Sequence, residues 1–455
     1  MNFRDLALRN VSAGATVPSF AGLTNLRNLT LTYNNAQVAL PVLTLTAGGN
    51  LNVTAGGAIT QSGAVVAPGT TTLAAESTNN ITLNHVGNNF NTIGITSGNN
   101  VVLTDANDLV LAVSTVSGIL NVTTNGELTQ SGALNIIGTT ALAAGAANNI
   151  TLNNAGNNFS TVGITSANNV TLNNTNALTM NVSTVSGNFS INAGDLTIGG
   201  PVASTGGSLN LTGANTVTQL ANLTANGANA VTVTTTGGPV TMAAAATTTS
   251  GTGAISYTAG TDVTLGSLST GGGVNVFALG GSILSAAGSG TNVSAGAPST
   301  LQAFNGIVGR QAAPMTVSVN PGTLSIRATG AVAGISVFLT GTVLPSNAIT
   351  LSNVPPGLVC FNICAVASVP VPVVVDSSTF GFPETIIPSY YPQPSKSVLI
   401  SDITSDYMPG TLLQPSPVSL SSGNPAVRSM GPKAKAGVRC TQGASASFDA
   451  YCKVE

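Results

Sequence analysis

The chain has 455 residues, a net charge of −2 and a charged fraction of 5%, where about 25% is usual for a soluble domain. No Lys or Arg lies between Asn28 and Gly309, and nucleic acid or a heparin-like polyanion needs clustered basic residues, so neither is expected as a partner. No run of about 18 apolar residues occurs, so we expect no membrane-spanning helix.

The first segment, residues 1–20, is expected to be a short lead-in. Its opening sequence MNFRDLALRN carries Asp5 and has no apolar stretch of about 7–15 residues, so it is not predicted to be a signal peptide. We therefore expect that the export region lies upstream of this sequence or that the protein leaves the cell by another route.

The second segment, residues 21–350, contains an internal repeat. Segment 58–124 recurs as segment 127–193, a 69-residue offset (127 − 58), with identity at 38 of 67 positions, and residues 48–60 form a partial third copy. The runs TQSGA, NNITLN and STVSG recur in both full copies. A period of this kind predicts a stacked solenoid and not an ordinary globular core.

Within the repeat, short runs such as ITL at 81–83 and LVLAV at 109–113 are separated by Gly and Asn. Alternating β-branched residues between turn residues predict short strands and no helices. We expect an all-β, right-handed parallel β-helix in which each 69-residue unit divides into three coils of about 23 residues. About 15 coils at about 4.8 Å each would give a rod on the order of 70 Å long.

Asn and Thr replace charge in this segment for a physical reason. Equivalent residues of stacked coils lie about 4.8 Å apart, so a repeated charge would face its own copy. Stacked Asn can instead form hydrogen-bond ladders at the turns. The NN pairs are expected to do so; they occur at 79–80, 88–89, 99–100, 148–149, 157–158 and 168–169.

Candidate catalytic residues are few. Asp105 and Asp108 are the close acidic pair of the repeat and could serve as acid and base or hold Ca²⁺. Their equivalents are Asn174 and Ala177, which favours a solvated turn. His85 replaces the turn residue Asn154 and is expected to be an exposed polar residue. We predict no catalytic residue, no metal site and no cofactor.

The third segment, residues 351–455, is predicted to be an irregular Pro-rich tail. It holds all four Lys, all four Cys and 13 of the 22 Pro, the latter between Pro355 and Pro432, and Pro removes ladder donors. Cys360, Cys364, Cys440 and Cys452 are possible disulfide partners with three possible connectivities. A loop closed by Cys440 and Cys452 is favoured, with free or cross-chain thiols as the alternative; disulfides would indicate an exported protein.

Three phrases resemble the repeat and distal regions of filamentous haemagglutinin-like large exoproteins, the passengers of two-partner secretion. They are GELTQSGAL at 126–134, NNITLNNAGNNFSTVGITSANNVTL at 148–172 and NPGTLSIRATGAVAGISV at 320–337. The resemblance implies a right-handed parallel β-helix at the bacterial surface, exported through an outer-membrane pore partner. The secretion domain's Asn-Pro-Asn motifs are absent. In some such adhesins a terminal Cys pair, like Cys440 and Cys452 here, forms a hook at the pore.

The leading hypothesis for function is a non-catalytic adhesin rod, extracellular or on the bacterial outer-membrane surface, that binds a glycan or protein of a host or bacterial surface. An alternative is a subunit that self-associates into an extracellular filament or sheath. A β-helix enzyme that degrades polysaccharide is a third hypothesis. The frequent Asn-x-Ser/Thr triplets also allow glycosylation.

Overall fold

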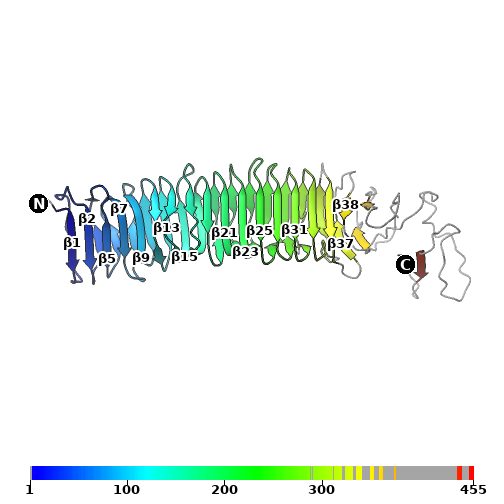
Figure 1. The fold of residues 1–455 in the computed structure, drawn as a ribbon, viewed down its shortest axis with the longest axis horizontal. Helices are drawn as coiled ribbons and strands as arrows, with labels where there is room; N and C mark the ends of the chain where they lie inside the picture. Colours follow the sequence, from blue (N-terminus) through cyan, green and yellow to red (C-terminus); the bar gives the residue numbers. More distant parts are fainter. Residues whose placement is uncertain are drawn as a thin grey trace, which may run out of the picture.

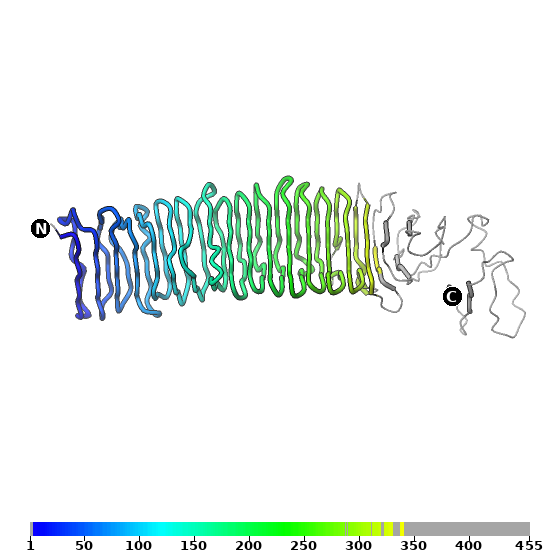
Figure 2. The backbone as a smooth tube through the Cα atoms, in the orientation of Figure 1, coloured from blue at the N-terminus to red at the C-terminus, as the bar shows by residue number. Residues whose placement is uncertain are grey.

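The chain folds into an elongated stack of parallel strands, seen side-on in a computed structural model (Figures 1 and 2). The structure describes residues 3–286, 288, 290–310, 312–319, 323–330 and 335–340, and the backbone of short strands further on. The described residues contain no helix, and the pairings along the rod are parallel. The predicted parallel β-solenoid of about 15 coils is therefore confirmed.

Two long strand columns face each other across the core, and we call them face I and face II. Face I contains β1 (Asp5–Asn10), β2 (Asn28–Tyr33), β5 (Leu51–Ala55), the second halves of β7 (Val65–Ala74) and β9 (Asn89–Ser97), β11 (Leu109–Leu111), β14 (Leu128–Gln130), β16 (Ile150–Leu152), β18 (Val170–Asn173), the first halves of β21 (Phe189–Ile198) and β23 (Leu209–Gln219), β25 (Val231–Thr235), β28 (Ile255–Ala259), β31 (Val274–Ala278), β34 (Ser299–Ala303) and β36 (Leu324–Ala328). Since β1 pairs with β2, the stack already begins within the segment expected to be a lead-in.

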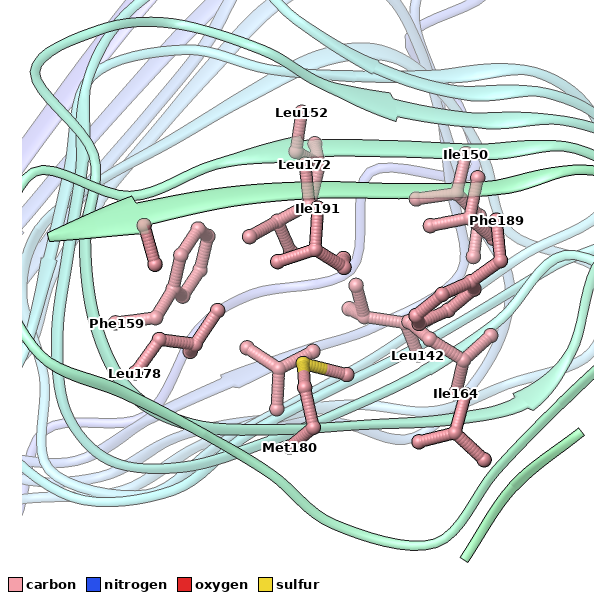
Figure 3. Packing of buried hydrophobic residues seen from close by; sticks show 14 of the residues in the cluster. Leu142, Ile150, Leu152, Phe159, Ile164, Leu172, Leu178, Met180, Phe189 and Ile191 are labelled. Carbon is pink, nitrogen blue, oxygen red and sulfur yellow. The ribbon is translucent and has the colours of Figure 1, made fainter. Parts of the chain in front are cut away.

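Face II contains β3 (Val38–Leu40), β6 (Ile59–Gln61), β8 (Ile81–Leu83), β10 (Val101–Asp105), β13 (Leu120–Thr124), the second halves of β15 (Leu134–Ala143) and β17 (Asn158–Ser166), β19 (Leu178–Met180), the second halves of β21 and β23, β26 (Val240–Met242), β29 (Val263–Leu265) and β32 (Ile283–Ser285). Figure 3 shows Leu152, Leu172 and Ile191 entering the core from face I, opposite Leu178 and Met180 of face II. One hydrophobic cluster runs without a break from Phe20 to Leu339.

A shorter third strand closes most coils at one edge of the stack. Edge A is the side where the chain returns from face II to face I, and edge B is the side where it passes from face I to face II. On edge A the third strands are β4 (Leu43–Thr44), the first part of β7 and of β9, β20 (Ser183–Val185), β22 (Val202–Ser204), β24 (Leu223–Ala225), β27 (Thr247–Ser250), β30 (Ser267–Thr270), β33 (Val293–Ala295) and β35 (Met315–Val319). On edge B they are β12 (Ser114–Val116) and the first parts of β15 and β17.

The repeat unit does not contain a whole number of coils. Strand register links Leu51, Thr71, Ile93 and Leu111 on face I, so three coils lie between positions 51 and 111. The chain then crosses to Leu120, the equivalent of Leu51 in the next unit, and Leu120 pairs with Val101 on face II. One unit therefore makes three and a half coils, and the prediction that it divides into three whole coils was wrong.

Equivalent residues in successive units consequently occupy equivalent positions on opposite faces. Thr71 on face I and Thr140 on face II are both fully buried, and both hydroxyls lack a hydrogen-bond partner. The half-coil also explains why the third strand changes edges. Because each unit adds half a coil, the third strand moves from edge A to edge B within one unit and returns to edge A within the next. Beyond about residue 193, where the exact repeat ends, the third strand stays on edge A through the described coils.

The predicted tail, residues 351–455, lies largely outside the described residues. Its described backbone comprises β38 (Ile349–Ser352), β39 (Leu358–Phe361), β40 (Val373–Val375), β41 (Val438–Gln442) and β42 (Ala450–Val454). β37 (Ile335–Thr340) pairs with β35 at the end of the rod.

Candidate functional surface

Columns of small polar residues cover the outside of both faces. On face II an uninterrupted column of threonines is formed by register partners in seven successive coils: Thr139, Thr161, Thr179, Thr197, Thr218, Thr241 and Thr264. The matching column of face I is polar except at Val110, and its members are Thr70, Thr92, Val110, Thr129, Thr151, Thr171, Ser190, Asn210, Thr232, Ser256, Asn275, Thr300 and Ser325. Each step of a column is one strand spacing, about 4.8 Å.

A hydrogen-bond ladder joins the residues that precede the strands of face I. Six residues in successive coils each accept, through a side-chain oxygen, a hydrogen bond of 2.7–3.1 Å from the equivalent residue of the next coil, and the last donor is Ala230 N. The acceptors are Asp108, Glu127, Asn149, Asn169, Asn188 and Ser208. Most donors are backbone N–H groups. Asn169 Nδ2 also donates to Asn149 Oδ1 at 3.0 Å, which is the amide-to-amide bond predicted for stacked Asn.

Two of the NN pairs do not form the predicted ladder with both members. Asn88 and Asn157, the first residues of the pairs 88–89 and 157–158, point into the core and are fully buried. Each amide makes a paired contact with a Gln one coil earlier, Gln61 and Gln130 respectively. The side chains of these two Asn therefore hold the turn together from inside the core, and the prediction of a ladder of stacked Asn at these two positions was wrong.

The acidic pair is divided by burial, so the prediction of a solvated turn is confirmed for Asp108 and wrong for Asp105. Asp105 is 1% exposed, and its carboxylate accepts from Phe90 N at 2.7 Å and Asn107 N at 2.9 Å. Asp108 is exposed and holds Glu127 N. Burial raises the pKa of Asp105, the two backbone donors lower it, and the charge of Asp108 raises it further. Both carboxylates thus have a structural partner.

Replacing Asp105 by Asn is expected to raise the stability of the rod at neutral pH by about 1 kcal/mol. The equivalent Asn174 accepts from Phe159 N in the same way and also donates to the Asn176 and Ala177 carbonyls. Because the folded pKa of Asp105 is raised, its contribution favours folding at low pH and is lost as the pH rises above about 4. Asp105→Asn should remove that loss.

Thermal unfolding at pH 4 and pH 7 measures this effect. Asp262→Asn is the matched control, because Asp262 is exposed and its Oδ1 accepts one backbone N–H, from Ser282 at 2.6 Å. A D105N protein less stable than wild type at both pH values would contradict the assignment of a buried Asp105 carboxyl whose pKa is raised.

His85 lies in an exposed turn, as predicted. Its Nδ1 accepts from Gly87 N at 3.0 Å, and the equivalent Asn154 Oδ1 accepts from Gly156 N at 2.8 Å. The imidazole therefore reproduces the hydrogen bond of the asparagine that it replaces. Among the residues that the structure describes, no group of three or more His, Cys, Asp or Glu side chains could hold a metal ion.

The predicted disulfide residues lie outside the part of the chain whose side chains are described. The backbone of β41 and β42 forms an antiparallel pair in which Cys440 is the register partner of Cys452. Cys360 falls in β39, and Cys364 lies outside the described residues. The disulfides stay a prediction. Within the described residues, no helix is long and apolar enough to cross a membrane.

The fold and its outer columns define the class of this chain, a repeat protein of the parallel β-solenoid type. A family model described as "Repeats of unknown function (DUF5649)" matches residues 26–97, 98–166 and 167–218. The second and third matches begin at positions 98 and 167, and this spacing equals that of the internal repeat. No curated protein and no solved structure matches the chain.

Proposed function

We propose that this protein is a non-catalytic rod, displayed outside a bacterial cell, that mediates attachment to a glycan or protein on another surface. The observation that carries the proposal is the pair of outer faces, each a column of Thr, Ser and Asn that continues over many coils. Repeated uncharged hydroxyl and amide groups suit many weak hydrogen bonds to an extended partner, whose summed strength is an avidity effect. The resemblance to exported exoproteins supports the location and a pore partner for export.

An attachment assay with face-specific variants tests the proposal. Thr197→Lys with Thr241→Lys changes face II and leaves Thr218 between the two charges, so that they do not face each other directly. Asn210→Lys with Ser256→Lys is the same change on face I, around Thr232. Binding of each labelled protein to host cells, bacterial cells, matrix proteins and a glycan array is compared, with circular dichroism to check folding.

We expect wild-type protein to bind at least one of these surfaces and at least one double variant to lose tenfold or more of that binding. Binding to none of the surfaces would overturn the proposal. So would equal binding by wild type and both folded variants, because attachment would then not use the faces.

A further inference from the structure

Exposed apolar side chains gather where the third strand changes edges. Five large hydrophobic residues between positions 80 and 190 are 43–78% exposed: Val86, Val113, Ile119, Ile137 and Val182. Single exposed hydrophobics are ordinary on a protein surface, whereas a grouped set marks an interaction surface. Their positions relative to the third strand are therefore informative.

Three of these residues flank the third strands of edge B, which we call the ledge: β12 and the first parts of β15 and β17. Val113 directly precedes β12, Ile119 follows it, and Ile137 follows the first part of β15. The next coil leaves Val113 uncovered because it places Gly132 beside it, where an added Cβ would lie 2.4 Å from Val113 Cγ2. The glycine thus keeps the apolar side chain accessible.

On edge A the coils at the same height lack a third strand, and we call this stretch the gap. Four turns there run directly from face II to face I, at 106–108, 125–127, 144–149 and 167–169. The gap ends at coils that carry the third strands of β9 and β20. Val86 lies three residues before β9, and Val182 directly precedes β20. The two remaining exposed hydrophobics therefore mark the two ends of the gap.

The ledge and the gap have similar lengths along the rod, and their polar groups are complementary. Three strands of the ledge span about 14 Å and four coils of the gap about 19 Å. The ledge carries amides, with Asn158 Nδ2 donating to Asn135 Oδ1 at 2.9 Å, and its sequence has no charged residue. The gap exposes the carboxylates of Asp108 and Glu127. Amide donors facing carboxylates form charge-assisted hydrogen bonds.

We propose that the rods associate side by side, with the ledge of one copy seated in the gap of a second copy. The half-coil of the repeat puts ledge and gap on opposite edges at the same height, so the contact joins two different surfaces. Each pair of rods keeps one ledge and one gap free for further copies, and the association continues into a flat row of parallel rods. This association does not depend on what the faces bind.

The test uses one variant for each surface. The ledge variant is Val113→Thr with Ile119→Asn and Ile137→Ser; the repeat itself carries Asn50 and Asn188 at the positions equivalent to Ile119. The gap variant is Val86→Thr with Val182→Thr. The control variant changes exposed hydrophobics elsewhere on the rod, Val42→Thr, Leu220→Thr and Leu279→Thr. Analytical ultracentrifugation and electron microscopy of the full chain measure association.

Wild type and the control variant should form concentration-dependent rows, while each surface variant alone stays as single rods, with association weakened at least tenfold. A 1:1 mixture of ledge and gap variants should form pairs that grow no further, because each pair has one intact ledge and one intact gap. Wild-type rods that stay single at every concentration would overturn the proposal. Rows formed equally by the ledge variant, or a mixture that does not pair, would also overturn it.

Discussion

Replacing Asn157 by alanine is expected to destabilise the coils around it by about 4 kcal/mol, because one fully buried amide satisfies five partners. Its Oδ1 accepts from Gln130 Nε2 and Leu134 N, and its Nδ2 donates to Gln130 Oε1, Leu152 O and Asn173 O, all within 2.8–3.2 Å. Alanine leaves these groups buried without partners, at about 1–3 kcal/mol for each group that water cannot reach.

Asn88→Ala should show the same loss, since Asn88 makes the same five bonds to Gln61, Val65, Leu83 and Thr104 on the opposite side of the rod. Hydrogen exchange in coils 128–173 and the thermal midpoint measure the effect, because solenoids open locally as well as globally. Asn153→Ala is the control; Asn153 is exposed, and a surface substitution changes stability by about 0.5 kcal/mol or less. Equal stability of N157A and N153A would contradict the role assigned to the buried amide.

The sequence predicted the stack because stacking follows from what each copy contains. Short alternating runs such as ITL at 81–83 bury Ile81 and Leu83 on one side of the strand, and the copy at 150–152 does the same. Uncharged turns follow from the close spacing of equivalent residues; in the ladder from Asp108 to Ala230, every position after Glu127 is uncharged. These features are local, and local patterns are visible in one sequence.

The half-coil was not predictable from the repeat length alone. Counting residues gives the length of a unit, but the face on which the next unit starts depends on pairings between coils, such as that of Thr71 with Ile93. The ledge and the gap follow from that phase, so sequence reasoning missed them. The signal available was the short spacing between the strand runs at 93–97, 101–105 and 109–111, which leaves no room for a third strand.

A buried polar network likewise could not be predicted from the sequence. Tyr257 on face I donates to Gln219 Oε1 of face II at 2.6 Å and lies 2.6 Å from Thr248 Oγ1 of the third strand, and all three residues are fully buried. Burial raises the pKa of the Tyr257 phenol, so the hydroxyl keeps its proton. The three residues lie outside the exact repeat and come from three strands, so no spacing rule brings them together.

Removing one complete unit, residues 120–188, is expected to leave a folded rod whose later coils lie on the opposite faces. The deletion joins Ile119 to Phe189, and Phe189 then takes the place of its equivalent Leu120 on Val101. The new contact has a precedent in the native pair Val170 and Phe189, because Val170 is the equivalent of Val101. Three and a half coils, about 17 Å, are lost.

Formation of an engineered disulfide would show that the later coils have moved to the opposite faces. Val102 is equivalent to Thr171, which pairs with Ser190 in the native rod, so Val102→Cys with Ser190→Cys should place the two thiols on adjacent strands of the shortened protein, within bridging distance. In the full-length chain Val102 pairs with Asn121 on face II while Ser190 lies on face I, and no bridge should form. Peptide mapping distinguishes this bridge from those of the native cysteines.

The matched control removes about three coils, residues 120–177, and joins Ile119 to Leu178. Leu178 is a face II residue two positions before Met180, which is the register equivalent of Leu120 three coils later. In that protein Thr179 stands opposite Val102, Ser190 stays on face I, and the engineered bridge should be absent although the rod is shortened by a similar amount. A bridge in both deletions, or in neither while both fold, would mean that the unit does not advance by half a coil. Because the ledge and the gap arise from that half-coil, the 120–188 deletion should also abolish row formation, since its third strand changes edge once and does not return.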